Sequence, residues 1–401
     1  MQSLEWMAFD RIKHFERQLA KIKTSDFIRK STESALKVIE CAIDALRGDI
    51  EEASTLGDKS YLSQKSITVN QKLFSFTNYL GILLRSTNTR NCFEAYFSFS
   101  NIVEQLTGHK DVLIISSEWD ASPFYIQQPP EVLKNFFFIG FPAFASRNAL
   151  LLPLAAHEIG HAIWRLNEVE GQVYTTAEYF LNEYLMENKK ISGSHKSLFD
   201  QIDDEEFLGR TLTLILSQTQ EIFCDLFGAY LFKKSYSYAF EQYLAPGFGK
   251  RDVAYPSFER RIKYIREAAF EGSDGNKGLI DDSLLRPSMR SLSSEAAAAD
   301  FVATKIHDSL CGVVKKILAE ANLLEYSSEE EIKIFSCLKS GVPPYVATSA
   351  IVVLNATWKL YLDGINLLDD VDERHKFSAF INNLCMKSLE IIEYNKLEES
   401  I

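Results

Sequence analysis

Apolar positions recur every three or four residues along most of this chain, which is the spacing of one helix face. The pattern predicts helices through residue 108, where Gly108 ends the last of them, with a polar connection over residues 49–60. The first apolar series comprises Phe9, Ile12, Phe15, Leu19 and Ile22. We expect this region to form a supporting helical layer.

Two short apolar runs depart from the helical spacing. Residues 112–115 read VLII and residues 136–141 read FFFIGF, and turn-forming residues, among them Pro129 and Pro130, separate the two runs. Runs of this length that are rich in β-branched and aromatic residues predict strands. The second run is either an ordinary core strand or the rim of a cleft, where it could pair with an extended peptide.

Helical spacing returns after the second run and continues to the C-terminus. The predicted helices are residues 153–166, 175–189, 206–233, 256–270, 294–324, 328–339, 346–362 and 372–397. We therefore expect a mostly α fold with a small β-sheet (α+β). The predicted regions are a helical N-terminal region (1–110), a core (111–271), a linker rich in Gly, Ser and Asp (272–293) and a C-terminal helical region (294–401).

Charge and cysteine usage narrow the class of protein. The formal net charge is −12, so no nucleic-acid partner is expected, because phosphates would repel the chain. The six cysteines stand singly in apolar helical surroundings, which predicts buried free thiols in a reducing compartment. The N-terminus is charged and no long apolar run occurs, so we expect no signal peptide, no membrane span and a cytoplasmic protein.

The most informative stretch reads LLLPLAAHEIGHAIWRL and contains the pattern H-E-x-x-H at His157, Glu158 and His161. Histidines four residues apart on a helix lie on one face, so both imidazoles can reach one metal ion. Glu158 can lean toward the open side of that ion, where a water molecule would bind. Two metal-binding histidines and an adjacent glutamate are the minimal sequence pattern of a zinc hydrolase.

Three other histidines offer no comparable pattern. His195 lies in a polar loop, and His307 and His375 lie on charged helix faces without partners at ligand spacing. We expect all three to be solvated surface residues.

A second feature is a pair of acids on the long apolar helix predicted at residues 206–233. Glu221 and Asp225 are four residues apart and therefore share a helix face. Burying two carboxylates without a counter-charge costs on the order of several kcal/mol each. A metal cation, together with a charged or N–H-donating histidine, would remove that cost.

A catalytic zinc site needs three protein ligands, of which the H-E-x-x-H histidines supply two. The metzincin pattern would require glycine at Trp164 and histidine at Asn167, so that class is excluded. H-E-x-x-H followed by E-x-x-x-D on a later helix resembles the gluzincin peptidases. That resemblance implies that Glu221 is the third zinc ligand and that Asp225 orients a ligand histidine through an N–H···O bond.

The segment QEIFCDLFGAYL also resembles the N/D-E-x-x-A-D-x-x-A segment of HtpX-like and CAAX-processing peptidases, with Cys224 in place of their alanine. Those peptidases often carry a later H-P-P-x-x-x-R-I pattern. Residues 255–262 read YPSFERRI here, with Tyr255 at the histidine position. The resemblance implies a zincin-like catalytic core over about residues 136–265, with an oxyanion donor at Tyr255 or Arg261.

These features predict a Zn²⁺-dependent metallopeptidase of the gluzincin type, an endopeptidase acting on protein or peptide substrates with Glu158 as general base. Two alternatives stay open. One is a helical interaction protein that retains the zincin core as a structural metal site. The other is a latent peptidase whose cleft opens when a regulatory protein partner binds. The intact Glu158 favours the enzyme, because a structural site has no use for a general base.

Overall fold

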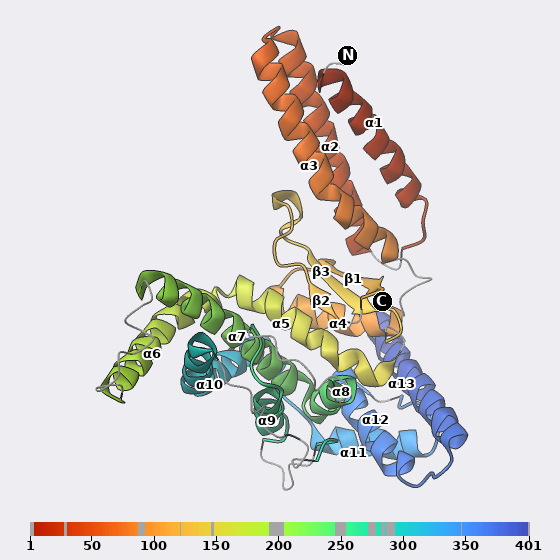
Figure 1. The fold of residues 1–401 in the computed structure, drawn as a ribbon. Coiled ribbons are helices and arrows are strands. Elements are labelled where there is room, and N and C mark those ends of the chain that lie inside the picture. The colour runs from red at the N-terminus through yellow and green to blue at the C-terminus, as the bar shows by residue number, and fades with distance from the viewer. Residues whose placement is uncertain are drawn as a thin grey trace. The chain divides into compact units, whose positions relative to one another are not determined.

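The computed structural model describes residues 4–27, 30–86, 93–120, 122–145, 148–191, 204–244, 254–271, 278–281, 285, 293–345 and 347–399. The chain divides into two compact units, Met1–Arg147 and Asn148–Ile401. Most described residues are helical, and one small mixed sheet accompanies them (Figure 1), which confirms the predicted fold class. The four regions drawn from the sequence stay predictions.

The first unit begins with three long helices that pack along one another (Figure 1). They are α1 (Leu4–Lys23), α2 (Lys30–Thr55) and α3 (Lys59–Arg85), and α4 (Phe93–Thr107) follows. The predicted connection at 49–60 is too long, because Ile50 and Ala53 extend the buried stripe of α2. The chain turns only at Gly57, where φ is 68°, and the Asp58 side chain caps α3.

The sheet of this unit contains β1 (Leu113–Glu118), β2 (Phe124–Tyr125) and β3 (Phe137–Pro142), with a short 3₁₀ turn, η1 (Glu131–Leu133), before β3. Both predicted strands are confirmed, whereas the two-residue strand β2 is too short to show a pattern in the sequence. The order is β1-β3-β2, with β3 parallel to β1 and antiparallel to β2. Because β3 is buried and paired on both sides, it is a core strand and not a rim that accepts a peptide.

Every secondary-structure element in the described part of the second unit is a helix. Its elements are η2 (Ala149–Leu154), α5 (Ala155–Leu166), α6 (Val169–Ile191), α7 (Asp204–Phe232), α8 (Lys234–Leu244), α9 (Phe258–Ala269), α10 (Ser294–Glu320), α11 (Ser328–Lys339), α12 (Ala350–Ile365) and α13 (Val371–Glu399). Pro153 lies in the 3₁₀ turn η2, so the H-E-x-x-H helix begins two residues after the predicted start. The sequence pattern did not reveal α8, which follows α7 after a single break at Lys233.

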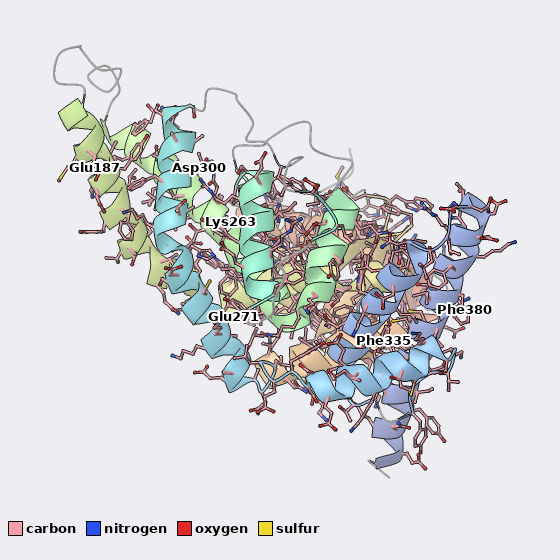
Figure 2. The ribbon with its side chains drawn as sticks, turned by 90° about the horizontal axis from the view of Figure 1, so that it is seen from below. Glu187, Lys263, Glu271, Asp300, Phe335 and Phe380 are labelled. Atoms are coloured by element: carbon pink, nitrogen blue, oxygen red, sulfur yellow. The ribbon has the colours of Figure 1, made fainter. Side chains whose placement is uncertain are left out.

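Helix α7 is the centre of this unit, because α5, α6, α9 and α10 all pack against it. Its side chains are buried over most of the segment 221–232. Arg260 of α9 also pairs with Asp300 of α10, the residue labelled in Figure 2. Nowhere in the described part of the chain is a helix long and apolar enough to cross a membrane.

Several predictions about single residues need correction. Cys224 and Cys385 are buried free thiols as predicted, but Cys41 is exposed, because it lies on the outer face of α2. His375 is exposed as predicted, whereas His195 lies outside the described residues. The prediction for His307 is wrong: only 13% of its side chain is exposed, because a neighbouring aromatic ring covers it.

Candidate metal centre

Helices α5 and α7 approach each other closely at Gly160. A Cβ atom at this position would lie 3.0 Å from the Cα of Cys224, which is tighter than nearly all real Cβ contacts. Glycine therefore permits the two helices to touch one residue before His161. This contact brings the histidines of α5 to the acids of α7.

Glu221 faces both histidines of the H-E-x-x-H pattern. Its Oε2 lies 3.2 Å from Nε2 of His157, and its Oε1 lies 3.6 Å from Nε2 of His161. The two imidazole rings are nearly perpendicular, with centroids 4.9 Å apart. Ligands about 2.1 Å from a tetrahedral ion lie roughly 3.4 Å from each other. The distances from Glu221 to the two histidines are therefore close to those between ligands of one metal ion.

Asp225 fixes the tautomer of His157. Arg261 donates two hydrogen bonds to Asp225, with Nε 2.6 Å from Oδ2 and a terminal nitrogen 2.9 Å from Oδ1. Burial would raise the pKa of Asp225, but the charge of Arg261 and its hydrogen bonds lower that pKa to about 2. Since this carboxylate carries no proton, Nδ1 of His157 must donate the 3.0 Å bond between them.

A neutral His157 then presents a lone pair at Nε2 to the carboxylate of Glu221. Two acceptors 3.2 Å apart repel each other unless a cation lies between them. Glu221 Oε2 is buried, and within the described residues it receives no hydrogen bond of acceptable geometry. A second proton on His157 is one remedy. Burial lowers the pKa of His157, but hydrogen bonds to Asp225 and Glu221 raise it to about 10. A metal ion is the other remedy.

The pKa of His161 is shifted in the opposite direction to that of His157. Burial and the charge of His157 lower the pKa of His161 to about 4, so its imidazole is neutral at pH 7, as a metal ligand must be. Burial raises the pKa of Glu221, but interaction with His157 and Arg261 holds it below its usual range. The donor set is thus one anionic carboxylate and two imidazoles, which suits Zn²⁺.

Tyr236 is part of the same network. Its hydroxyl donates to Asp225 Oδ1 at 3.1 Å and lies 3.5 Å from Nδ1 of His157. The ring reaches this position across Gly228, where a Cβ atom would meet it at 2.3 Å. The sequence offers Tyr236, with Tyr230 and Tyr238, only as a candidate to line the cleft, and it does not predict the bond to Asp225. The glycine on the central helix is the signal that could have found it.

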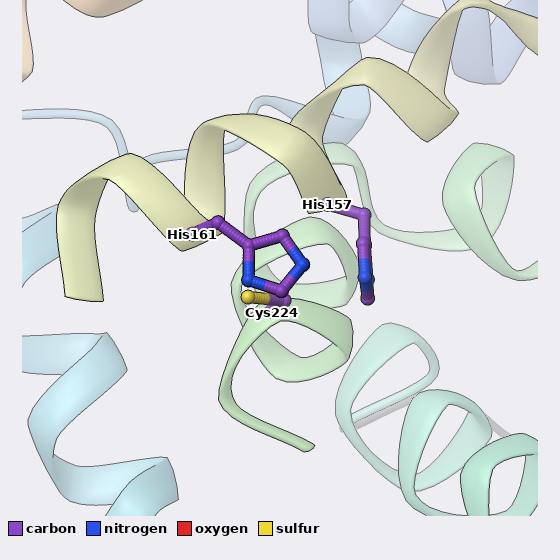
Figure 3. A group of neighbouring side chains, drawn as sticks. All are labelled: His157, His161 and Cys224. Atoms are coloured by element: carbon purple, nitrogen blue, oxygen red, sulfur yellow. The ribbon is translucent and has the colours of Figure 1, made fainter. Parts of the chain in front are cut away.

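Cys224 is a second candidate for the third ligand. Ligand atoms of His157, His161 and Cys224 all lie within 4.8 Å of one another. Figure 3 shows the sulfur beside His161, on the side of that ring away from His157. Burial, followed by nearby carboxylates, raises the pKa of this thiol well above its usual value. Glu221 could supply this ligand instead, because it faces the Nε2 atoms of both histidines and its pKa is held below the usual range.

Glu158 is buried at the same place, with 6% of its surface exposed. Burial raises its pKa to about 7, with His157 lowering it and Glu221 raising it. A carboxyl group with a pKa near neutrality can accept and return a proton at physiological pH. Glu158 therefore has the proton affinity expected of a general base.

The two oxyanion donors predicted from the sequence lie on or near α9. The Arg261 guanidinium is bound to Asp225, packs 5.0 Å from the centroid of Phe240 and lies 3.7 Å from Glu221 Oε2. The Tyr255 ring lies 5.7 Å from that guanidinium and is 43% exposed. Their role in oxyanion binding stays a prediction.

No family description matches this chain, and no curated protein or solved structure shows detectable similarity to it. The functional argument therefore rests on the side chains of the site.

Proposed function

We propose that this chain is a zinc-dependent metallopeptidase that hydrolyses peptide bonds in protein or peptide substrates. The observation that carries the proposal is the contact between His157 Nε2 and Glu221 Oε2, which lie 3.2 Å apart and need either a second proton or a metal ion between them. Glu221 also lies 3.6 Å from Nε2 of His161, so one ion could contact all three side chains. The adjacent Glu158 supports hydrolysis over a purely structural role.

A zinc ion held by these ligands would supply Lewis acidity to a water molecule and to the scissile carbonyl. Glu158 takes the proton from the attacking water and returns it to the leaving amine. Asp225 keeps the Nδ1 proton on His157, so that Nε2 stays available as a ligand atom. Arg261 balances the charge of the two acids. Because Arg261 is engaged by Asp225, the oxyanion donor is assigned to Tyr255.

The test compares zinc content and hydrolysis in matched variants. Purified wild-type protein should contain about one zinc per chain and cleave a proteome-derived peptide library. Glu158→Gln should keep the zinc and lose about 10²–10⁴-fold in rate, because only the proton acceptor is removed. Glu221→Ala should lose the zinc. Glu170→Gln, at an exposed acid on α6, is the control and should change neither quantity.

Two results contradict the proposal. One is a wild-type protein that binds no stoichiometric zinc by elemental analysis, even after reconstitution. The other is a Glu158→Gln variant that cleaves peptides as fast as the wild type.

A second candidate function is a structural metal site, favoured by the position of Cys224 beside His161. A thiolate added to the two histidines and Glu221 would complete four-coordination and leave no open position. Cobalt substitution distinguishes the two functions. A near-ultraviolet thiolate-to-cobalt band that disappears in Cys224→Ala would favour the structural site, whereas its absence in the wild type supports the peptidase.

A further inference from the structure

A second cluster of reactive side chains lies on α10, outside the candidate metal centre. His307 and Cys311 are one helical turn apart, and the Cys311 sulfur lies 3.7 Å from Nε2 of His307. The other ring nitrogen, Nδ1, lies 3.1 Å from Oδ1 of Asp308. A thiol, an imidazole and a carboxylate are therefore in sequential contact.

The imidazole of this cluster is held in a fixed orientation. The Tyr264 ring of α9 stacks on His307, with centroids 3.9 Å apart and planes 25° from parallel. Tyr264 is itself buried. Stacking of this kind leaves the ring nitrogens free to act in the ring plane, where Nε2 meets the sulfur.

The thiol also contacts Tyr230 of α7, whose ring has two lysines beside it. The Tyr230 hydroxyl hydrogen-bonds to Cys311, and the ammonium groups of Lys315 and Lys233 lie 4.9 and 5.8 Å from the Tyr230 ring centroid. Lys315 also pairs with Glu271, the residue labelled at the end of α9 in Figure 2. The sulfur therefore has two hydrogen-bonding neighbours, the Tyr230 hydroxyl and Nε2 of His307.

The acidic groups of the cluster act mainly on the imidazole and the tyrosine. Burial lowers the pKa of His307, but contact with Cys311 and with Asp308 raises it above its usual value. Glu271 and Glu267 raise the pKa of Tyr230 after burial and Cys311, so its hydroxyl stays a donor. His307 therefore holds a proton more firmly than an ordinary histidine does.

We propose that Cys311 is a reactive thiol activated by His307, and that hydrogen peroxide oxidises it to a sulfenic acid. The thiolate sulfur attacks one peroxide oxygen, so that an S–O bond forms and the O–O bond breaks. The sulfur loses two electrons, and the departing hydroxide takes the Nε2 proton of His307 and leaves as water. Cys311 is partly exposed, so a small oxidant can reach it. This proposal does not depend on the peptidase assignment.

The test uses the full-length protein and its other cysteines as internal references. Cys337 on α11 is also half-exposed, and no imidazole contact is recorded for it among the described residues. At pH 6.5, iodoacetamide should alkylate Cys311 at least about fivefold faster than Cys337, measured by mass spectrometry of each peptide. Brief treatment with peroxide followed by dimedone should label Cys311 by the same margin.

His307→Phe is the matched variant, because it keeps an aromatic ring for Tyr264 and removes Nε2. It should lower the Cys311 rate to that of Cys337, and His307→Gln should do the same. The buried thiols Cys224 and Cys385 should stay unlabelled, which verifies that each variant is folded. Equal rates for Cys311 and Cys337 in the wild type, or a Cys311 rate unchanged in both folded variants, would overturn the proposal.

Discussion

Two buried clusters of acids and arginines share helix α9 but are completed in different ways. In the first, Arg266 donates to both carboxylate oxygens of Glu241, at 2.8 and 2.9 Å. The Ile280 N–H and the Ser237 hydroxyl also donate to Glu241, at 2.9 and 3.2 Å. Each carboxylate oxygen of this fully buried acid has donors, so the cluster needs nothing from outside the chain.

The second cluster runs from Arg261 through Asp225 and His157 to Glu221. Donors and acceptors match as far as Nδ1 of His157, and the series then ends with Nε2 facing a carboxylate. Burying charge is costly unless every group is paired. The first cluster is therefore complete as an ion pair, whereas the second needs one more positive charge, either a second proton on His157 or a metal ion.

The largest expected loss of stability comes from breaking the first cluster, Arg266 with Glu241. Arg266→Leu leaves the Glu241 charge buried without its counter-charge, which should lower the free energy of unfolding by about 3–5 kcal/mol. Chemical denaturation of the purified protein measures this loss. Lys263→Leu, on the same helix but in an exposed pair with Glu267, should change stability by less than about 0.5 kcal/mol. Equal losses in both variants would remove the distinction between the clusters.

An effect of intermediate size should appear in the pH dependence of metal-free protein. The pKa of His157 is raised to about 10 in the folded chain, from 6.5. The resulting stabilisation is complete below a pH of about 6.5 and is lost as pH rises through the folded pKa, with roughly 3 kcal/mol of it lost between about pH 6.5 and pH 9. Urea unfolding at several pH values measures it. Zinc-loaded protein should not show the loss between pH 6.5 and 10, because the metal replaces the proton. A parallel decline in both forms would contradict the assignment.

The smallest effect concerns the hydroxyl at the edge of the second cluster. Tyr236→Phe removes one donor to Asp225 and should cost about 1 kcal/mol of stability. Zinc affinity, measured by competition with a chelator, should fall roughly tenfold, because Asp225 then holds His157 less firmly. Tyr238→Phe is the control on α8, since that ring packs against Phe270 and Trp358. An unchanged affinity for Tyr236→Phe would exclude it from the network.

The sequence predicted the site best where its residues lie on one helix, because helical spacing then places their side chains together. His157, Glu158 and His161 share one helix, so their spacing alone places them together, as the structure has them. The helical regions were also predictable, because apolar side chains recur along them. Glu221 and Asp225 stood out because acids are costly on a buried helix, and the structure brings both to His157.

The sequence could not predict contacts that depend on which helices become neighbours. Tyr236 joins the centre only because Gly228 lets its ring cross α7. His307 lies on a helix face with charged residues, which predicts that it is exposed. The packing of Tyr264 against the ring buries it instead. When a side chain is buried by a residue from another helix, the sequence around it does not indicate the burial.

Helix α9 takes part in both clusters, with Arg261 and Arg266 five residues apart. That spacing corresponds to about 7.5 Å along the axis. A helix tied at two points can neither slide nor turn without breaking one of them. Gly278 lies against the Arg266–Glu241 cluster, where a Cβ atom would lie 2.2 Å from Arg266 and Glu241. A side chain at Gly278 would displace Arg266 and so disturb α9, which also carries Arg261. If the chain binds zinc as proposed, the lifetime of the bound metal therefore depends on a glycine in a segment that supplies no ligand.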